Sequence, residues 1–257
     1  MKKLSAVIIA GNEEHNIARC LESLQGVADE IIVLNSFSTD QTVAICRSYG
    51  VRLYQREWAG YSESKNYANS LSQYPWILSL DADEALSEKL RISILRVKED
   101  GAHDAYRVNR LNSYLGKWIR HGSWYPDRKV RLWRSGLAKW EGNVHEKLVF
   151  RQKVSMGQLQ GDLLHYTLNN HSQQLLQIDK FSTLWAEEAF KNGKSTTLMA
   201  MILKPFARFV KNYFLKGGFR DGHEGFVIAR MSSFAVFLRL IKLKALSNQA
   251  RPKPVSP

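Results

Sequence analysis

Cysteine is nearly missing from this chain of 257 residues, which has only Cys20 and Cys46. Two isolated cysteines supply neither a disulfide framework nor a metal site built on cysteine pairs, so a reducing compartment is expected. Long apolar runs are missing as well, because no stretch reaches the ~18 uncharged apolar residues that a membrane-spanning helix needs. The apolar run near the N-terminus ends at Ala10 and is too short for a secretory signal, so we interpret it as a buried strand.

Acidic residues are scarce in the last quarter of the chain. From Lys191 onward only Asp221 and Glu224 oppose thirteen lysines and arginines, which leaves +11 of the net +13 charge in this segment. A basic segment on a nearly neutral body predicts an anionic partner, either a membrane surface or nucleic acid. No nucleic-acid-binding motif is recognisable, and the interleaved apolar residues favour basic amphipathic helices on a membrane. The alternative is a helical bundle whose charges are simply solvated.

The first hundred residues alternate between short apolar runs and segments with helical spacing. Strands are expected at 4–10, 30–34, 51–54 and 75–80. Helices are expected at 16–24, 39–49, 62–71 and 87–98. Ser87 should cap the last of these helices, and Gly50 should end the second. This alternation predicts βαβ units and a parallel sheet.

The remainder of the chain changes character twice. Residues 101–165 are rich in Trp, Tyr, Arg and Gly and predict mixed sheet with long loops, whereas three helices are expected from residue 171 onward. The helices are expected at 171–191, 196–215 and 223–247. The expected organisation is a catalytic domain over 1–165, a basic amphipathic helical region over 166–250 and a disordered tail over 251–257.

Three carboxylates follow the fourth expected strand, in the segment PWILSLDADEALS. In an open α/β sheet, ligands bind beyond the carboxyl ends of the strands, which is where Asp81 lies. If the backbone stays extended, Asp81 and Asp83 point to the same side and can share a hard cation, Mg²⁺ or Mn²⁺. The alternative is a solvated turn in which Asp83 or Glu84 helps to cap the next helix.

Several segments together resemble family 2 glycosyltransferases of the GT-A fold. They are AVIIAGNEEHNIARCLESL, DEIIVLNSFSTDQT, SESKNYANSLSQYPWILSLDADEALS and NVHEKL. Two further segments, YLGKWIRHGSWYPDRKVRLWR and KGGFRDGHEGF, are similar to the bacterial subgroup that includes the lipopolysaccharide core β-1,4-glucosyltransferases. The resemblance covers all but the proline-rich tail. It implies a Rossmann-like α/β domain of the GT-A fold with a C-terminal helical extension.

The resemblance also implies a donor site for a nucleotide-sugar, with a UDP-sugar favoured, and a divalent metal, Mg²⁺ or Mn²⁺, at Asp81 and Asp83. Asn35 departs from the family, which usually has Asp there, and an amide donates as well as accepts hydrogen bonds. The residues that the resemblance places at the donor are Ala10, Asn12, Glu13, Asn35, Lys65, Asp81 and Arg131. Structural alternatives are a helix cap for Asn12, a surface lysine for Lys65 and a turn for Asn35.

An inverting transfer needs a carboxylate that takes the proton of the acceptor hydroxyl. Between the Asp-x-Asp motif and the helical region the candidates are Asp127 and Glu146. We expect Glu146 to be the base, since the resemblance places a His-Glu pair of catalytic type there. His145 would orient it or contact the metal or the diphosphate; the alternative is an ordinary loop or core histidine.

The acceptor site is expected around the aromatic segment that precedes Asp127. Flat apolar rings suit pyranose faces, although aromatic side chains also serve as plain core. The residues assigned to acceptor binding are Trp118, Trp124, Tyr125 and Asp127. Strand alternation places Lys129 and Arg131 on one face, where they would hold the diphosphate, and the alternative is a solvated basic strand.

The sequence therefore predicts a metal-dependent inverting glycosyltransferase, cytoplasmic and peripheral on the inner face of the cytoplasmic membrane. It would move a hexose, with glucose favoured, to a lipid-linked envelope glycan such as lipopolysaccharide core, without a nucleic-acid partner. One alternative is a nucleotidyltransferase, disfavoured because the segment AGNEEHN lacks a glycine-rich basic phosphate loop. Another is a basic membrane- or nucleic-acid-binding module with an inactive domain, disfavoured by the intact Asp81, Asp83 and Glu146.

Overall fold

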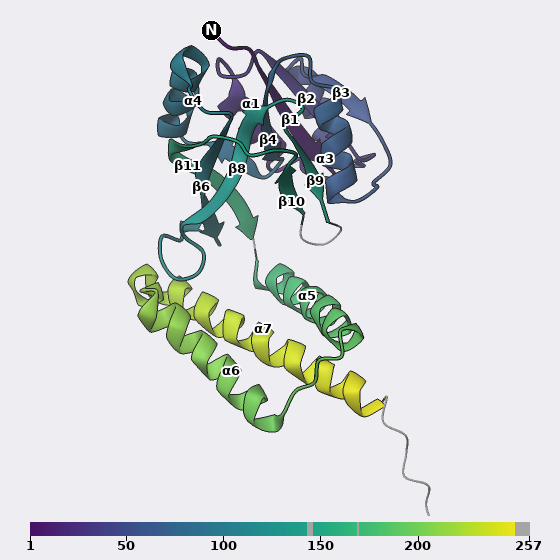
Figure 1. Cartoon of the computed structure of the whole chain (residues 1–257), viewed down its shortest axis with the longest axis vertical. Coiled ribbons are helices and arrows are strands. Elements are labelled where there is room, and N and C mark those ends of the chain that lie inside the picture. Colours follow the sequence, from purple (N-terminus) through teal and green to yellow (C-terminus); the bar gives the residue numbers. More distant parts are fainter. Residues whose placement is uncertain (143–145, 169, 250–257) are drawn as a thin grey trace, which may run out of the picture. The chain divides into compact units, whose positions relative to one another are not determined.

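The computed structural model describes residues 1–142, 146–168 and 170–249 (Figure 1). Contacts divide the chain into two compact units, Met1–Asn112 with Asp127–Tyr166 and Ser113–Pro126 with Thr167–Pro257. The aromatic segment Ser113–Pro126 thus groups with the C-terminal helices, although the sequence placed it with the sheet. The tail expected to be disordered lies outside the described residues.

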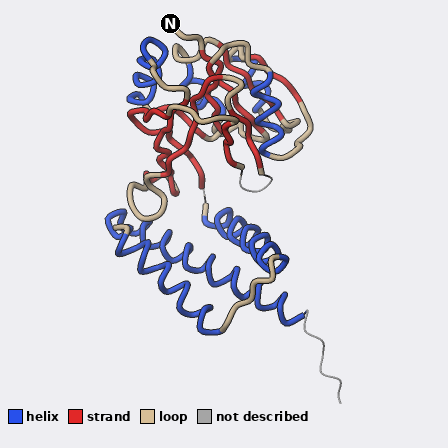
Figure 2. The backbone as a smooth tube through the Cα atoms, in the orientation of Figure 1, coloured by secondary structure: helices blue, strands red, loops and turns tan. Residues whose placement is uncertain are grey.

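The strands of unit 1 are red in Figure 2. Parallel strands form the first half of the main sheet, in the order β3-β2-β1-β4. These strands are β1 (Leu4–Ala10), β2 (Glu30–Asn35), β3 (Arg52–Gln55) and β4 (Trp76–Asp81). The helices that follow β1, β2 and β3 are α1 (Ile17–Leu24), α2 (Thr42–Ser48) and α3 (Tyr61–Ser70). The expected βαβ units are confirmed. β1 pairs with a strand on each side and is buried along its whole length, which is why its sequence is continuously apolar.

Antiparallel strands continue the sheet from β4, in the order β8-β6-β11-β5. They are β5 (Glu84–Leu86), β6 (Ala105–Tyr114), β8 (Asp127–Arg134) and β11 (Met156–Leu168), with β7 (Lys117–Trp118) paired to β6. Among the described residues, a separate two-stranded sheet consists of β9 (Ala138–Glu141) and β10 (Lys147–Phe150). Helix α4 (Glu88–Asp100) begins after Ser87, whose hydroxyl accepts from the Leu90 N–H, so the expected cap is confirmed.

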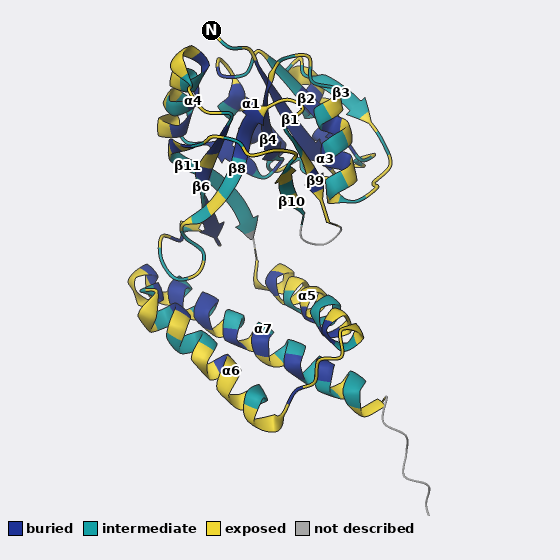
Figure 3. Cartoon of the chain, in the orientation of Figure 1, coloured by how far each residue is buried: buried dark blue, intermediate teal, exposed yellow. Residues whose placement is uncertain are grey.

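The core lies on both faces of the sheet, because successive side chains of a strand point to opposite sides. Ile8 belongs to one buried cluster with side chains of α1 and α4, whereas the adjacent Ile9 belongs to a second cluster with Ala68 of α3 and Trp133 of β8. Figure 3 shows these strands as buried beneath more exposed helices. The sheet is therefore covered by packed side chains on both faces.

Gly161 in β11 is a position where a side chain cannot fit. Its φ is +89°, and a Cβ there would lie 2.5 Å from the backbone nitrogen of Leu90. Gly161→Ala should therefore lower the free energy of unfolding by about 1–3 kcal/mol beyond the cost of the left-handed backbone alone. Gly136→Ala is the matched control, because Gly136 has φ +81° and nothing within 4 Å of its Cβ position. Equal losses for the two variants, measured by urea unfolding, would contradict the contact with α4.

Unit 2 is helical. Its elements are α5 (His171–Lys191), α6 (Leu198–Val210), the π-helical turn η1 (Lys211–Leu215), the 3₁₀ turn η2 (Gly218–Asp221) and α7 (Gly222–Gln249). α7 packs against both α5 and α6. The helix expected over 196–215 therefore ends its α-helical part at Val210 and continues as a π turn. Among the described residues, none of the helices has both the length and the apolarity to cross a bilayer.

The aromatic segment of unit 2 is held by a buried carboxylate at the start of α7. Asp221 accepts hydrogen bonds from the backbone N–H groups of Arg120 and His121, and its Oδ1 lies 2.9 Å from the His121 ring. Trp124 packs edge-on against Tyr114, with ring centroids 5.6 Å apart. These contacts give the segment a fixed conformation within this unit.

Candidate active site

The loops after β1 and β2 are joined by asparagine side chains. Asn12 has φ +55°, and its Oδ1 accepts from the Thr39 N–H at 2.8 Å, while its own N–H donates to Ser38 Oγ. Asn12 does not cap α1, because Asn16 occupies the cap position. The helix-cap alternative for Asn12 is wrong, and its side chain instead fixes the loop 36–39 beside the carboxyl end of β1.

Asn35 ends β2 opposite Ala10 and is fully buried. Its Oδ1 accepts from the Ser38 hydroxyl at 2.5 Å, whereas its Nδ2 has no hydrogen-bond partner among the described residues. A buried amide donor without a partner costs free energy unless a ligand supplies an acceptor. The amide at this position therefore presents a spare donor where the usual carboxylate would present only acceptors.

Asp81 lies between two buried cations at the carboxyl end of β4. Lys65 Nζ lies 2.8 Å from Asp81 Oδ1, and an Arg131 nitrogen lies 2.8 Å from Oδ2. Burial raises the pKa of Asp81, but the charges of Arg131 and Lys65 outweigh it and hold the pKa below its ordinary value. The surface-lysine alternative is wrong, because only 2% of the Lys65 side chain is exposed.

Glu84 is a member of this cluster that the sequence analysis did not assign. It is fully buried, lies 2.6 Å from Arg131 and 3.3 Å from Arg110, and accepts from the Asp81 N–H at 3.0 Å. Burial lowers the pKa of Arg131, but Glu84 and Asp81 raise it above its ordinary value. Three charged side chains thus fix one another, and Arg131 serves as a scaffold for Asp81.

Asp83 faces a different partner, because the backbone turns at Ala82 and Asp83 rather than staying extended. Asp81 and Asp83 therefore do not point to the same side of one extended strand, as a cation shared through strand alternation would require. Asp83 Oδ2 lies 3.1 Å from His165 Nε2, and His165 Nδ1 lies 2.7 Å from Asn112 Oδ1. The two contacts hold the His165 ring between Asn112 and Asp83, so one imidazole nitrogen lies directly beside a carboxylate oxygen. An imidazole nitrogen and a carboxylate oxygen this close together can both bind one divalent metal ion.

His165 was not predicted, although it is well suited to bind a metal beside Asp83. A carboxylate and a neutral imidazole whose other nitrogen is hydrogen-bonded are a frequent ligand pair, and Mn²⁺ accepts both. Within the described part of the chain, no three His, Cys, Asp or Glu side chains form a complete metal site. Any ion held here would take its remaining ligands from water and from substrate oxygens.

Glu146 is joined to Asp81 through one ammonium group. Lys65 Nζ lies 3.1 Å from Glu146 Oε1 and also faces the Trp140 ring at 4.7 Å. Asn66 of α3 holds the β9 strand by accepting from the Trp140 N–H and donating to its carbonyl, both at 2.8 Å. Helix α3 therefore positions both Lys65 and the hairpin that carries Glu146. His145, predicted to assist Glu146, lies outside the described residues.

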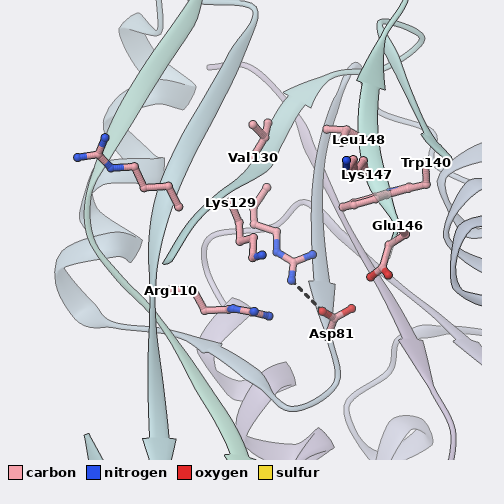
Figure 4. A pocket seen from close by; sticks show the side chains of 10 residues that line it. Asp81, Arg110, Lys129, Val130, Trp140, Glu146, Lys147 and Leu148 are labelled. Carbon is pink, nitrogen blue, oxygen red and sulfur yellow. Dashed lines mark hydrogen bonds and ion pairs between the residues drawn. The ribbon is translucent and has the colours of Figure 1, made fainter. Parts of the chain in front are cut away.

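Asp81 and Glu146 both line a pocket of about 640 Å³ (Figure 4). Five of its lining residues are basic, so the pocket is suited to an anionic group despite its two carboxylates. The lining residues are Asp81, Arg110, Arg128, Lys129, Val130, Arg131, Trp140, Glu146, Lys147 and Leu148. In Figure 4 the side chains of Arg110 and Lys129 lie on one side of Asp81 and Glu146 lies on the other.

The remaining predicted positions fall into two groups. The pKa of Glu13 is raised above its ordinary value, mainly by burial. A hydrogen bond from Asn16 lowers this pKa, whereas the nearby charge of Asp83 raises it further. Asp127 is paired with Arg110 at 2.7 Å; burial raises its pKa, but Arg110 leads the charges that lower it. The predicted acceptor residues Trp118, Trp124 and Tyr125 belong to unit 2. Their role stays a prediction.

Arg131→Met should lower the free energy of unfolding by about 3–5 kcal/mol near neutral pH, because it leaves buried carboxylates without their cation. The lowered pKa of Asp81 contributes stability that is present above its ordinary pKa and is lost as the pH falls. The deficit of the variant should therefore shrink at about pH 3. Arg128→Met, which removes an exposed arginine of the same strand, is the control. Urea unfolding that shows the same deficit at both pH values would contradict the ion-pair account.

Comparison with known proteins identifies the chain. The family model described as "Glycosyl transferase family 2" matches residues 5–156. The chain belongs to glycosyltransferase family 2. Its sheet with C-terminal helices is accordingly a GT-A fold, as the resemblance implied. An uncharacterised glycosyltransferase of Rickettsia typhi is 32% identical to this glycosyltransferase over 98% of this chain and 90% of the relative.

Another relative carries a more specific name. The lipopolysaccharide core biosynthesis glycosyltransferase LpsC of Rhizobium meliloti is 32% identical over 97% of this chain and 95% of its own length. Among solved structures, S. aureus TarS 1–349 in complex with UDP-GlcNAc is similar over 97% of this glycosyltransferase and 92% of that chain, with 14% identity and a TM-score of 0.49. Glucosyl-3-phosphoglycerate synthase from Mycobacterium tuberculosis, in complex with Mn²⁺ and UDP, covers 44% of each chain with 22% identity and a TM-score of 0.37.

Proposed function

We propose that this glycosyltransferase transfers a hexose, with inversion and with a divalent metal, from a nucleotide-sugar to a lipid-linked envelope glycan. The observation that carries the proposal is the link between Asp81 and Glu146 through Lys65. Through Lys65 the Glu146 carboxylate is held near Asp81 at the carboxyl end of β4, where donors bind in open α/β sheets, and this geometry supports Glu146 as the proposed base. The membership in family 2 and the name of the LpsC relative support the class of reaction and of acceptor.

The chemistry of the transfer divides among the residues of unit 1. The acceptor hydroxyl attacks the anomeric carbon of the donor and gives its proton to Glu146, while the bond from that carbon to the nucleoside diphosphate breaks. Lys65 keeps Glu146 and Asp81 in place, because its single ammonium contacts both. The basic pocket would hold the departing diphosphate through charge-assisted hydrogen bonds from Arg110, Lys129 and Lys147.

The proposed metal ligands are Asp83 and His165. Mg²⁺ or Mn²⁺ bound there would neutralise charge that develops on the diphosphate oxygens. The 3.1 Å separation of Nε2 and Oδ2 supports the pair, since neighbouring ligands of an octahedral ion with bonds of ~2.1 Å are about this far apart. Asp81, whose oxygens already face Lys65 and Arg131, would contact the metal only through a water or the donor.

The donor is proposed to be a UDP-hexose, with Asn12, Glu13 and Asn35 at the nucleoside. The lipid-linked acceptor would bring the enzyme to an anionic membrane surface on the cytoplasmic side. Incubation with a panel of nucleotide-sugars and isolated, truncated lipopolysaccharide core tests both proposals. The product glycan is analysed by NMR for the configuration of its new linkage. A product with the donor's own anomeric configuration would contradict inversion, and transfer only to soluble acceptors would contradict the acceptor class.

A further inference from the structure

Helix α6 has its apolar side chains on the side that α7 does not cover. Leu198, Ile202 and Phe206 recur at intervals of four residues, so they lie along one face of the helix. Their exposed fractions are 71%, 61% and 66%, and the adjacent Met199 and Leu203 are exposed at 67% and 53%. In most surface helices such a stripe faces the core. Here the stripe is exposed, although α6 packs against α7.

One edge of the apolar face of α6 contacts α7. Pro205 is buried, and its carbonyl accepts a hydrogen bond from the Ser233 hydroxyl of α7 at 2.8 Å. Pro205 lies three residues from Ile202 and is therefore its neighbour on the helix surface. The exposed fractions of Leu198, Ile202 and Phe206 show that α7 leaves the rest of the apolar face uncovered. The exposed face continues into η1, where Phe214 and Leu215 are 56% and 78% exposed. An apolar surface of this continuity requires a partner.

Charge complementarity identifies the kind of partner. Between Lys191 and Arg220 the sequence has no acidic residue, while its basic residues number seven. They are Lys191, Lys194, Lys204, Arg208, Lys211, Lys216 and Arg220. An apolar face in a segment whose charged side chains are all positive matches the interface of a bilayer with anionic headgroups, where apolar side chains reach the acyl region and cations reach the phosphates.

The basic residues of α7 have other contacts. Lys242 Nζ lies 2.7 Å from Asp179 Oδ1 of α5, and the Arg239 guanidinium lies 4.6 Å from the centre of the Trp185 ring. These residues join α5 to α7. They therefore support the bundle, although the sequence alone grouped them with the basic surface. The exposed lysines of α6 and η1 are Lys204 and Lys211.

We infer that α6 and η1 form an interfacial surface that inserts Leu198, Ile202, Phe206 and Leu215 into the headgroup region of an anionic lipid leaflet. The inference rests on the proposed function for its biological purpose, since a lipid-linked acceptor resides in that leaflet. Its physical basis lies within unit 2 alone. The surface would lie in the interface of one leaflet and would not cross the bilayer, which agrees with the length and composition of α6.

The test measures binding of the full chain to vesicles by sedimentation. Vesicles of phosphatidylcholine alone are compared with vesicles that also contain phosphatidylglycerol, at low and high salt. Ile202→Gln with Phe206→Gln should weaken binding by about 100-fold, because two large side chains no longer leave water. Lys204→Gln, Lys211→Gln and Lys216→Gln together should weaken binding to anionic vesicles by about 100-fold and reduce its salt dependence.

The matched control is Leu175→Gln with Leu176→Gln on α5, two apolar residues that are 47% and 72% exposed outside the proposed surface. This variant should bind vesicles as the wild type does. Circular dichroism and thermal unfolding establish that each variant is folded. Release of nucleoside diphosphate from the donor in solution is measured in parallel, so failure of vesicle binding is distinguished from failure of the catalytic proposal.

Several outcomes would overturn the inference. No binding to either vesicle type, or equal loss for the α5 control, would show that α6 is not the lipid-binding face. Concentration-dependent dimerisation in ultracentrifugation that disappears in the Ile202→Gln, Phe206→Gln variant, without vesicle binding by the wild type, would assign the face to a second copy of this chain. Binding to neutral vesicles that does not depend on salt would show that anionic headgroups are not needed and would contradict the electrostatic part of the inference.

Discussion

Asp83→Asn is expected to abolish metal-dependent donor binding and sugar transfer while leaving the fold intact. The substitution keeps the size of the side chain but removes the negative charge that faces His165 Nε2 at 3.1 Å. A hard divalent cation loses its charged oxygen ligand, and an amide oxygen is a weak substitute. In the metal-free protein, loss of the contact with His165 is offset by relief of repulsion with Glu13, so the thermal unfolding midpoint should change little.

A readout besides activity is the shift of the unfolding midpoint when Mn²⁺ and a nucleoside diphosphate are added together. Ligands that bind only the folded state raise the midpoint, so the wild type should respond and Asp83→Asn should not. Asp100→Asn, at the exposed end of α4, removes one carboxylate away from the site and should behave as the wild type. Transfer by Asp83→Asn at near the wild-type rate would refute the metal assignment.

Glu146→Gln should lower kcat by about 10²-fold or more while leaving donor affinity nearly unchanged. The amide fills the same space but does not accept the acceptor proton, and general-base catalysis contributes about 10²–10⁴-fold. Donor affinity should persist because Lys65 retains its contact with Asp81 at 2.8 Å. The measurement is single-turnover transfer at saturating donor, with binding of the nucleoside diphosphate determined separately.

Asp127→Asn is the control for this variant. Asp127 is paired with Arg110 at 2.7 Å and has no part in the link between Asp81, Lys65 and Glu146; burial raises its pKa, but charges led by Arg110 hold the pKa below its ordinary value. The Asp127→Asn variant should keep most of the wild-type rate of transfer. Urea unfolding shows whether any loss of rate comes from a less stable fold. An inactive but folded Asp127→Asn beside an active Glu146→Gln would require the two roles to be exchanged.

The parallel half of the sheet was predictable because its signals are local. β1, β2 and β4 are short, mostly apolar runs, and α1 has a single apolar face with Ile17, Leu21 and Leu24 buried. Gly50 ends its helix with φ +65°, as a C-terminal glycine should. The carboxylates after β4 were likewise predictable in place, because strand ends in a parallel sheet define where ligands bind.

The partners of those carboxylates were not predictable, because they come from distant strands. Glu84 meets Arg131 through the long-range pairing of β4 with β8, and His165 reaches the site because β11 pairs with β5. A signal for His165 existed in its position near the end of an apolar strand. The exposed face of α6 was not predictable for the same reason, since helical spacing indicates an apolar face but only the burial of its side chains in the folded chain shows whether a neighbour covers it.

The most direct test of the catalytic account is the release of nucleoside diphosphate from a panel of nucleotide-sugars in the presence of acceptor, with Mn²⁺ or with a chelator. We predict release from UDP-hexoses that requires the metal, is lost in Asp83→Asn and falls by about 10²-fold or more in Glu146→Gln. Release that persists unchanged in the chelator, or release from no member of the panel, would contradict a metal-dependent donor site at the carboxyl ends of β1 and β4.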